Sequence, residues 1–291
     1  MSISMDSQCL LCHLQRHVSN AQKLGDEATA TAFAKDLMAL YLSAPADVSS
    51  PWFAPGTSAL YQKHYGLEED RYRQEKQDSN AFVLARLDAI RSLVESQPDP
   101  VYAGLQFAGL GNYIDFSALQ GEVSFQKLED MLKLGTSLDL DKENYRQFCR
   151  DLEQGSSLHY LTDNAGEIGF DRICAEQIAR KYPHIAITFC VRGGPALNDA
   201  TREDAAAVDI PFPVIDNGTC IPGTQLDLLG EDAKHALHSS HVILSKGQAN
   251  VETLLGCGLN IYYAFLIKCQ RFISLFGKEK LTPMFHRERA E

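Results

Sequence analysis

The sequence has no apolar run long enough to span a membrane, which takes about 20 residues. Its first residues, MSISMDSQCLLCHLQRH, also lack the basic region and the long apolar core of a secretory signal. These two absences argue against a membrane protein and against an exported one. We therefore expect a cytoplasmic protein.

Positive charge is scarce as well. The 291 residues include 27 Lys and Arg but 38 Asp and Glu, which gives a formal net charge of -11. Nucleic acids and anionic membranes select surfaces with clustered Lys and Arg. The sequence therefore predicts neither a nucleic acid nor a membrane as partner, and any anionic substrate must be met by a local cation.

Eight cysteines in a chain without an export signal are expected to be reduced, and we predict no disulfides. The spacing of Cys9, Cys12, His13 and His17 places them on one face of one helix. CxxCH is the pattern of covalent haem attachment, but that chemistry takes place outside the cytoplasm. A zinc or redox site is a second interpretation, although no second ligand pair is apparent. Core cysteines beside a surface histidine are the third interpretation, which we favour.

The chain divides into two parts by its pattern. Residues 1–100 carry apolar residues at helical spacing between Gly and Pro breaks, which predicts a helical domain. The charged run 68–78 is interpreted as a solvated helix face. In residues 101–291, short apolar runs typical of strands alternate with helical patterns over most of the length. This alternation predicts an α/β domain with a mostly parallel sheet. The expected helices are 9–24, 26–42, 58–65, 80–96, 125–134 and 142–154. The expected strands are 158–162, 186–191, 212–215, 241–245 and 261–267. The last residues, HRERAE, are expected to fray.

The stretch from Leu158 to Ala175, LHYLTDNAGEIGFDRICA, is typical of a strand, a polar turn and a helix. Ligands collect at such turns in α/β sheets, because the free N–H groups and the dipole of the helix favour anions. Asp163 and Asn164 add two oxygen ligands suited to a hard divalent cation. The stretch predicts a metal and phosphate site, although Asp, Asn and Gly also form ordinary helix caps.

Two further strand ends carry similar chemistry. One expected strand leads into Arg192, two glycines and the pair Asn198 and Asp199, which offers more oxygen ligands. Another leads into Lys246 and Gly247 at the start of a helix, where the lysine is a suitable cation for a phosphate. Several such turns on one sheet edge are stronger evidence for a site than any one of them.

The motifs DNAGEIGFD, VRGGPALNDAT, VIDNGTCIPGT and LSKGQANVETL, with GNYIDF and an N-terminal CxxC upstream, resemble those of the metal-dependent damage-control phosphatases. The resemblance spans nearly the whole chain. It implies a helical N-terminal domain beside a three-layer, Rossmann-like α/β/α domain. It also implies a divalent cation, namely Mn, Co, Ni or Mg, and the hydrolysis of small phosphometabolites such as sugar phosphates or damaged forms of cofactor intermediates.

Carried over to this sequence, the resemblance makes Asp163, Asn164 and Asp199 the metal ligands, and Lys246 the group that holds the phosphate. The other residues that it places at the substrate or the phosphate are Asn112, Asp115, Glu167, Arg192, Gly247 and Asn250. The catalytic set then comprises Asp163, Asp199, Glu167 and Lys246, and either Glu167 or Asp115 could be the general base. A divalent ion neutralises phosphoryl oxygens and activates a water, while a lysine stabilises the developing charge. Direct attack by an aspartate is the alternative, and we favour the activated water.

Two other functions fit parts of the sequence. An adenosyl-cofactor methyltransferase would also be α/β, but it would need a glycine-rich turn after the first strand, where this chain has a single glycine, Gly166. A sensor that binds metal and a phosphorylated ligand without turnover would need nearly the same groups as a phosphatase. Hydrolysis of a generic phosphate ester separates the sensor from the enzyme.

Overall fold

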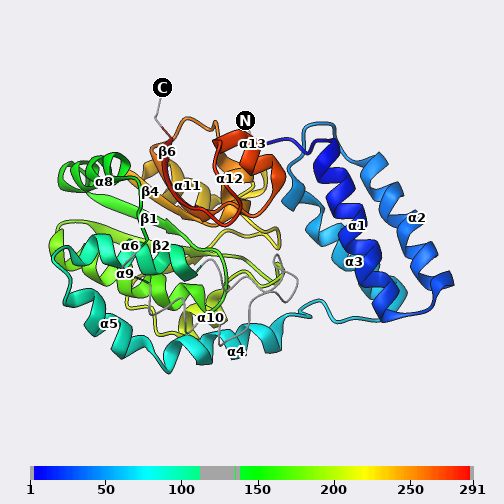
Figure 1. The fold of residues 1–291 in the computed structure, drawn as a ribbon, viewed down its shortest axis with the longest axis horizontal. Helices are drawn as coiled ribbons and strands as arrows, with labels where there is room; N and C mark the ends of the chain where they lie inside the picture. The colour runs from blue at the N-terminus through cyan, green and yellow to red at the C-terminus, as the bar shows by residue number, and fades with distance from the viewer. Residues whose placement is uncertain (1–2, 112–134, 136–137, 289–291) are drawn as a thin grey trace.

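The computed structural model describes residues 3–111, 135 and 138–288. Within them, a six-stranded sheet with the order β3-β2-β1-β4-β5-β6 forms the centre of the larger part (Figure 1). All neighbouring strands are parallel except β6, which runs antiparallel to β5. The strands are β1 (Ser157–Leu161), β2 (Ala186–Val191), β3 (Val214–Asp216), β4 (Val242–Lys246), β5 (Ile261–Leu266) and β6 (Pro283–Glu288).

Helices cover both faces of this sheet. Side chains alternate along each strand, so that Tyr160 and Leu244 belong to one core while Leu161 and Ile243 belong to the other. The first core includes side chains of α6 (Pro100–Gly111), α8 (Lys142–Gln154), α9 (Glu167–Lys181) and α10 (Arg202–Ala207). The second includes side chains of α11 (Glu231–Ser239), α12 (Gln248–Leu254) and α13 (Gln270–Phe276), and the short helix η4 (Leu226–Leu228) precedes α11. The predicted three-layer α/β/α architecture with a mostly parallel sheet is thus confirmed.

Three N-terminal helices stand beside the sheet and its layers (Figure 1). They are α1 (Ser7–Leu24), α2 (Glu27–Ser43) and α3 (Ala54–Tyr65), with η1 (Ser50–Phe53) leading into α3. They pack around a core that includes Phe33, Leu37 and Tyr61. We call α1, α2 and α3 the helical unit.

The next two helices belong by their packing to the sheet rather than to the helical unit. A single helix was expected over 80–96, but α4 (Arg73–Leu84) and α5 (Leu87–Glu95) are separate, and both pack against α9 in the core that contains Phe170. The interpretation of the charged run as a solvated face was wrong for Lys76, which is buried and pairs with Asp204 at 2.8 Å. The predicted domain boundary near residue 100 stays a prediction.

The C-terminal strand was not expected. The predicted fraying of the polar end is wrong for residues 286–288, because they form the second half of β6 along β5. Phe285 is buried against Phe148 and Tyr262, which anchors this strand to the core. An edge strand with one face in solvent needs few apolar residues, and its polar sequence therefore concealed it.

Some expectations fall outside the ranges given above. Asn112, Asp115 and the expected helix 125–134 lie outside the described residues. No helix in the described ranges is long and apolar enough to cross a membrane. All eight cysteines are free thiols.

Candidate functional site

The topology of the sheet fixes where a ligand can bind. Strand β1 lies between β2 and β4, and the helices that follow β1 and β4 cover opposite faces of the sheet. Loops that leave neighbouring parallel strands in opposite directions open a crevice at the carboxyl ends of those strands. Here the two loops carry Asp163 and Gly247, from the two motifs that the sequence singled out.

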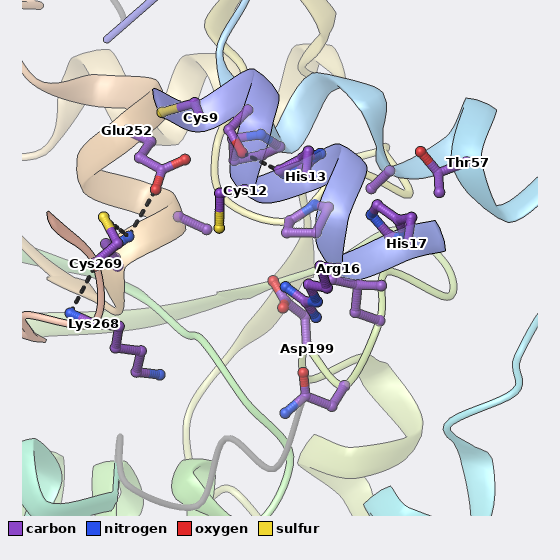
Figure 2. A pocket seen from close by; sticks show the side chains of 18 of the residues that line it. Cys9, Cys12, His13, Arg16, His17, Thr57, Asp199, Glu252, Lys268 and Cys269 are labelled. Atoms are coloured by element: carbon purple, nitrogen blue, oxygen red, sulfur yellow. Dashed lines mark hydrogen bonds between the residues drawn. The ribbon is translucent and has the colours of Figure 1, made fainter. Parts of the chain in front are cut away.

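A cavity of about 340 Å³ lies at this edge, between the sheet and the helical unit. Figure 2 shows that the residues around it come from several elements, with α1 forming one side. The predicted metal ligands Asp163, Asn164 and Asp199 line the cavity, although they come from two loops. The structure therefore brings together the three residues that the sequence grouped as ligands.

Backbone contacts join these two loops. Asn164 and Asp199 form an isolated antiparallel bridge, and the Ala200 N–H donates to the Asp163 carbonyl at 2.7 Å. A second bond runs from the Ala165 N–H to the Asn198 carbonyl at 2.9 Å. These bonds hold the backbone segments that carry the three candidate ligands next to each other.

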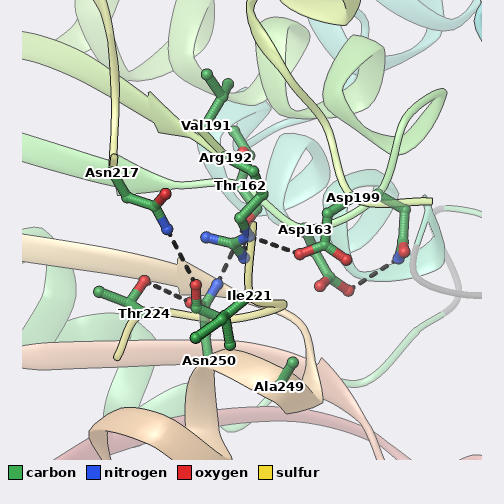
Figure 3. Close-up of polar contacts among 12 residues, drawn as sticks. Thr162, Asp163, Val191, Arg192, Asp199, Asn217, Ile221, Thr224, Ala249 and Asn250 are labelled. Atoms are coloured by element: carbon green, nitrogen blue, oxygen red, sulfur yellow. Dashed lines mark hydrogen bonds and ion pairs between the residues drawn. The ribbon is translucent and has the colours of Figure 1, made fainter. Parts of the chain in front are cut away.

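Side-chain hydrogen bonds then orient the ligands (Figure 3). The Asp199 carboxylate accepts a bond from the buried Arg192 guanidinium at 2.6 Å. The Asn164 amide nitrogen donates to Asp163 at 2.8 Å and to Glu167 at 2.9 Å. Since its nitrogen is directed at these two carboxylates, the Asn164 amide oxygen points away from them and is the atom available to a cation.

The donor set fits a hard divalent cation. Two carboxylates and one amide oxygen are ligands that Mg²⁺ and Mn²⁺ accept. Among the described residues no three His, Cys, Asp or Glu side chains are grouped to hold a metal, so a cation bound by Asp163 and Asp199 would need other ligands, such as the Asn164 amide oxygen or water. The backbone of Gly247 also presses against Asp163, because a Cβ atom at this position would overlap the Asp163 carboxylate. The residues present thus form a tightly supported oxygen site with room on the cavity side.

Comparisons with known proteins identify the family of this chain. The model of the damage-control phosphatase ARMT1-like domain matches residues 5–282. The chain belongs to the damage-control phosphatase family. Membership supports a phosphatase activity on phosphorylated metabolites.

Three of its relatives illustrate the extent of the similarity. The uncharacterised protein MJ0202 of Methanocaldococcus jannaschii is 31% identical over 283 residues, which are 92% of this chain and 90% of that protein. A damage-control phosphatase of Archaeoglobus fulgidus is 33% identical over 206 residues, 69% of this chain and 70% of that one. The crystal structure of the DUF89 family protein PH1575 from Pyrococcus horikoshii superposes with a TM-score of 0.83 at 24% identity, covering 98% of this chain and 99% of that one. The crystal structure confirms the fold.

In this chain, Lys246 lies behind the cavity wall. Its ammonium group is fully buried and donates to the Ala108 carbonyl at 2.8 Å, to Glu167 at 2.6 Å and to Asp171 at 2.7 Å. The two carboxylates raise the pKa of Lys246 despite its burial, while burial raises the pKa of Asp171 to about 7. All three N–H donors are used, so the predicted contact with phosphate requires Lys246 to exchange one of these partners for the substrate.

The other residues predicted at the phosphate are also bonded to the protein. The Asn250 amide donates to the carbonyls of Thr162 and Lys246 at 3.1 and 2.7 Å, and accepts from Thr224 at 2.7 Å. The Gly247 N–H donates to the Ala264 carbonyl at 3.0 Å. These residues, together with Arg192 and Glu167, surround and support the site from behind, and none of them lines the cavity. Their assignment to substrate binding stays a prediction.

Sequence reasoning missed the cations that do line the cavity of this family member. They are Arg16 of α1, Arg71 before α4, Lys268 after β5 and Arg271 of α13. A signal was present for Arg16, which shares a helix face with Cys12 and His13 by its spacing of four and three residues. Lys268 and Arg271 follow a strand end to which no motif had drawn attention.

The cysteine and histidine face of α1 also differs from the favoured interpretation. Cys12 is exposed, Cys9 is half-buried, and both line the cavity, whereas His17 is the buried residue. The interpretation of core cysteines beside a surface histidine was therefore wrong. The face is buried at His17 because this ring packs on Tyr61 of α3 and its Nδ1 lies 3.2 Å from the Tyr61 hydroxyl.

Proposed function

We propose that this protein is a divalent-metal-dependent phosphatase that hydrolyses small phosphorylated metabolites. The observation that carries the proposal is the meeting of Asp163, Asn164 and Asp199 at a cavity that cationic side chains also line. A cavity of about 340 Å³ is at the small end of ligand sites, which suits a metabolite rather than a macromolecule. The family to which the chain belongs supports the same activity.

We propose that Asp163, Asn164 and Asp199 hold the ion, which is Mn, Co, Ni or Mg. When bound, such an ion neutralises phosphoryl oxygens and lowers the pKa of water. Glu167 accepts hydrogen bonds from both Asn164 and Lys246, which supports a positioning role in which it holds the amide oxygen toward the cation. Arg192 supports Asp199 in the same way.

The test is the hydrolysis of para-nitrophenyl phosphate by protein that has been stripped with a chelator and then supplied with Mg, Mn, Co, Ni or Zn. We expect metal-restored activity in the wild type. In Asp163→Ala the activity should fall by more than about 100-fold, because even residues that only support metal ligands cost 10- to 100-fold. Asp88→Ala is the matched control, since the Asp88 side chain is 97% exposed and far from the cavity lining.

Two results would overturn the proposal. Full activity of Asp163→Ala with any of these metals would remove Asp163 from the site. Metal binding by calorimetry without hydrolysis of this ester or of a panel of sugar and cofactor phosphates would favour a non-catalytic sensor.

A further inference from the structure

We propose that the wall of the cavity opposite the metal ligands recognises a second anionic group of the substrate. This wall, which we call the helical wall, consists of His13, Arg16 and His17 of α1, Thr57 of α3 and Arg71. The substrate class would then be metabolites that carry, besides the phosphate to be removed, a carboxylate or a second phosphate at some distance from it. The inference rests on the proposed phosphatase function and narrows it.

Arg71 is the residue that carries the argument. Its guanidinium lies over the ring of Tyr61 at 4.2 Å and near the ring of Tyr72 at 5.0 Å from the centroids. No carboxylate pairs with it in the described part of the chain, and the nearby Asp70 pairs with Arg73 instead. Aromatic rings occupy the faces of a guanidinium, and N–H donors at its edge can then reach an anion. Arg71 is therefore a cation that stacks on two aromatic rings at the cavity, and its N–H donors have no carboxylate partner among the described residues.

Two uncharged atoms of the same wall lack hydrogen-bond partners among the described residues. The Thr57 hydroxyl is buried, with 3% of the residue exposed, and makes no hydrogen bond among the described residues. The Nδ1 atom of His13 is also buried and makes no hydrogen bond among the described residues, while its Nε2 atom is hydrogen-bonded to the Ser50 hydroxyl at 2.7 Å. Both residues line the cavity. Buried polar atoms without partners are uncommon and costly, so they indicate a place where a ligand supplies the missing bonds.

These groups form one continuous surface. The rings of His13 and His17 are 5.4 Å apart, those of His17 and Tyr61 are 5.8 Å apart, and Arg71 lies over Tyr61. Figure 2 shows Arg16 between these histidines and Asp199, so the wall faces the metal side of the cavity. The pKa of His13 is lowered to about 4 by burial, which leaves this ring neutral at pH 7. The positive charge of the wall therefore comes from its two arginines.

The charges around the cavity favour such a substrate. Behind the cavity, four carboxylates, those of Asp163, Asp199, Glu167 and Asp171, lie with Arg192, Lys246 and the proposed divalent ion, so the charge at the metal end is nearly balanced before the reacting phosphate arrives. On the far side, Arg271 already has a carboxylate near it, because it lies 3.5 Å from Asp6. Arg71 stays without a counter-ion. A second anionic group on the substrate supplies it, and a substrate with a neutral tail does not.

The experiment compares matched substrates in the metal-loaded enzyme. One pair is 3-phosphoglycerate and glycerol 3-phosphate, which differ in a carboxylate. The other is ribose 1,5-bisphosphate and ribose 5-phosphate, which differ in a second phosphate. We expect a higher kcat/KM for the doubly anionic member of at least one pair, and the pair that shows it identifies the anion as carboxylate or phosphate.

The variant that tests the assignment is Arg71→Gln. The ratio of kcat/KM within the preferred pair should fall about 10- to 100-fold, which is the effect of one lost charge-assisted hydrogen bond. Arg73→Gln is the matched control, because its side chain is 64% exposed and does not line the cavity. Its ratio should equal that of the wild type. A wild type without preference in either pair overturns the inference, as does a loss in Arg71→Gln that is equal for both members.

A binding measurement separates this inference from the proposed function. Isothermal calorimetry of the Mn-loaded protein with 3-phosphonopropanoate and with propylphosphonate, which lacks the carboxylate, needs no hydrolysis. Tighter binding of the carboxylate ligand, reduced in Arg71→Gln and in Thr57→Val, supports the helical wall even if no ester is turned over. Equal binding of the two ligands contradicts the wall even if the protein is an active phosphatase. Circular dichroism of both variants confirms that they fold.

Discussion

At the scale of single residues, the site depends on how closely the backbone approaches Asp163. Gly247 has a φ of +80° at the start of α12, a conformation that side chains other than glycine rarely adopt. A Cβ atom here would also overlap the Asp163 carboxylate. The glycine therefore lets the backbone approach Asp163, the proposed metal ligand, while its N–H is bonded to the Ala264 carbonyl.

We predict that Gly247→Ala displaces Asp163 and weakens metal binding about 10- to 100-fold, the range found for residues that support metal ligands. The measurement is calorimetric titration with Mn. Gly258→Ala is the control, since Gly258 shares a positive φ of +78° but a Cβ there would meet nothing within 4 Å. It should lose about 1 kcal/mol or more of stability and keep its metal affinity. Unchanged Mn binding by Gly247→Ala would contradict the close approach.

Single residues also show how far the sequence could lead. The meeting of Asp163, Asn164 and Asp199 at one cavity was predictable, because these residues follow strands whose carboxyl ends share an edge. The partners of Lys246 were not, because the sequence gives no measure of how α9 lies over β4. Glu167 and Asp171 are four residues apart on α9, so both carboxylates lie on one face of the helix. In the structure this face contacts the Lys246 ammonium group.

At the scale of elements, helix α1 is solvated at both ends and buried at His17 and Ala21 between them. Asp6 caps the helix by accepting a hydrogen bond from the Cys9 N–H at 2.9 Å, and His17 is buried against α3 two turns further on.

The position of β6 in the sheet explains why the sequence did not predict this strand. Parallel strands at the centre of a sheet are apolar throughout and stand out in the sequence, whereas the edge strand β6 shows only Phe285 as a buried apolar side chain. The positions of Arg16 and Arg71 depend on the docking of α1 and α3, which local patterns do not encode.

The burial of His17 makes the docking of α1 sensitive to pH. Burial and the nearby cations lower the pKa of His17 from its ordinary value of 6.5 to about 2. Below pH 6.5 the unfolded chain therefore takes up a proton that the folded protein excludes, and stability falls as the pH falls. We predict that lowering the pH from 7 to 5 costs about 2 kcal/mol through this residue. Urea unfolding at the two pH values measures it.

The control for this prediction replaces a histidine that is already in solvent. His17→Gln should lose less stability than the wild type between pH 7 and pH 5, because the residue that excludes the proton is gone. His235→Gln, on the exposed side of α11, should behave like the wild type. An identical pH dependence in all three proteins would show that other groups cause the acid sensitivity.

At the scale of the whole molecule, the cavity lies where two separately packed parts meet. Polar contacts join them near the cavity rim: the Ile3 N–H donates to the Glu252 carbonyl at 2.8 Å, and the Ser49 hydroxyl donates to Gln225 at 3.1 Å. The helical unit has its own core, and the metal ligands belong to the other part. A ligand that touches both walls therefore adds a further contact between the two parts.

This arrangement predicts how binding spreads through the molecule. With Mn and 3-phosphonopropanoate, amide hydrogen exchange should slow in α1 and α3 as well as in the loops that carry Asp163 and Asp199, because the ligand bridges the two parts and suppresses local opening. With Mn alone, the slowing should be confined to those two loops, since all three proposed ligands lie there. Propylphosphonate with Mn should resemble Mn alone at α1, because its tail has no charge for Arg71. Equal protection of α1 by both phosphonates would mean that the helical unit closes on the reacting phosphate itself, and the selection of a second anion would then have to occur elsewhere in the cavity.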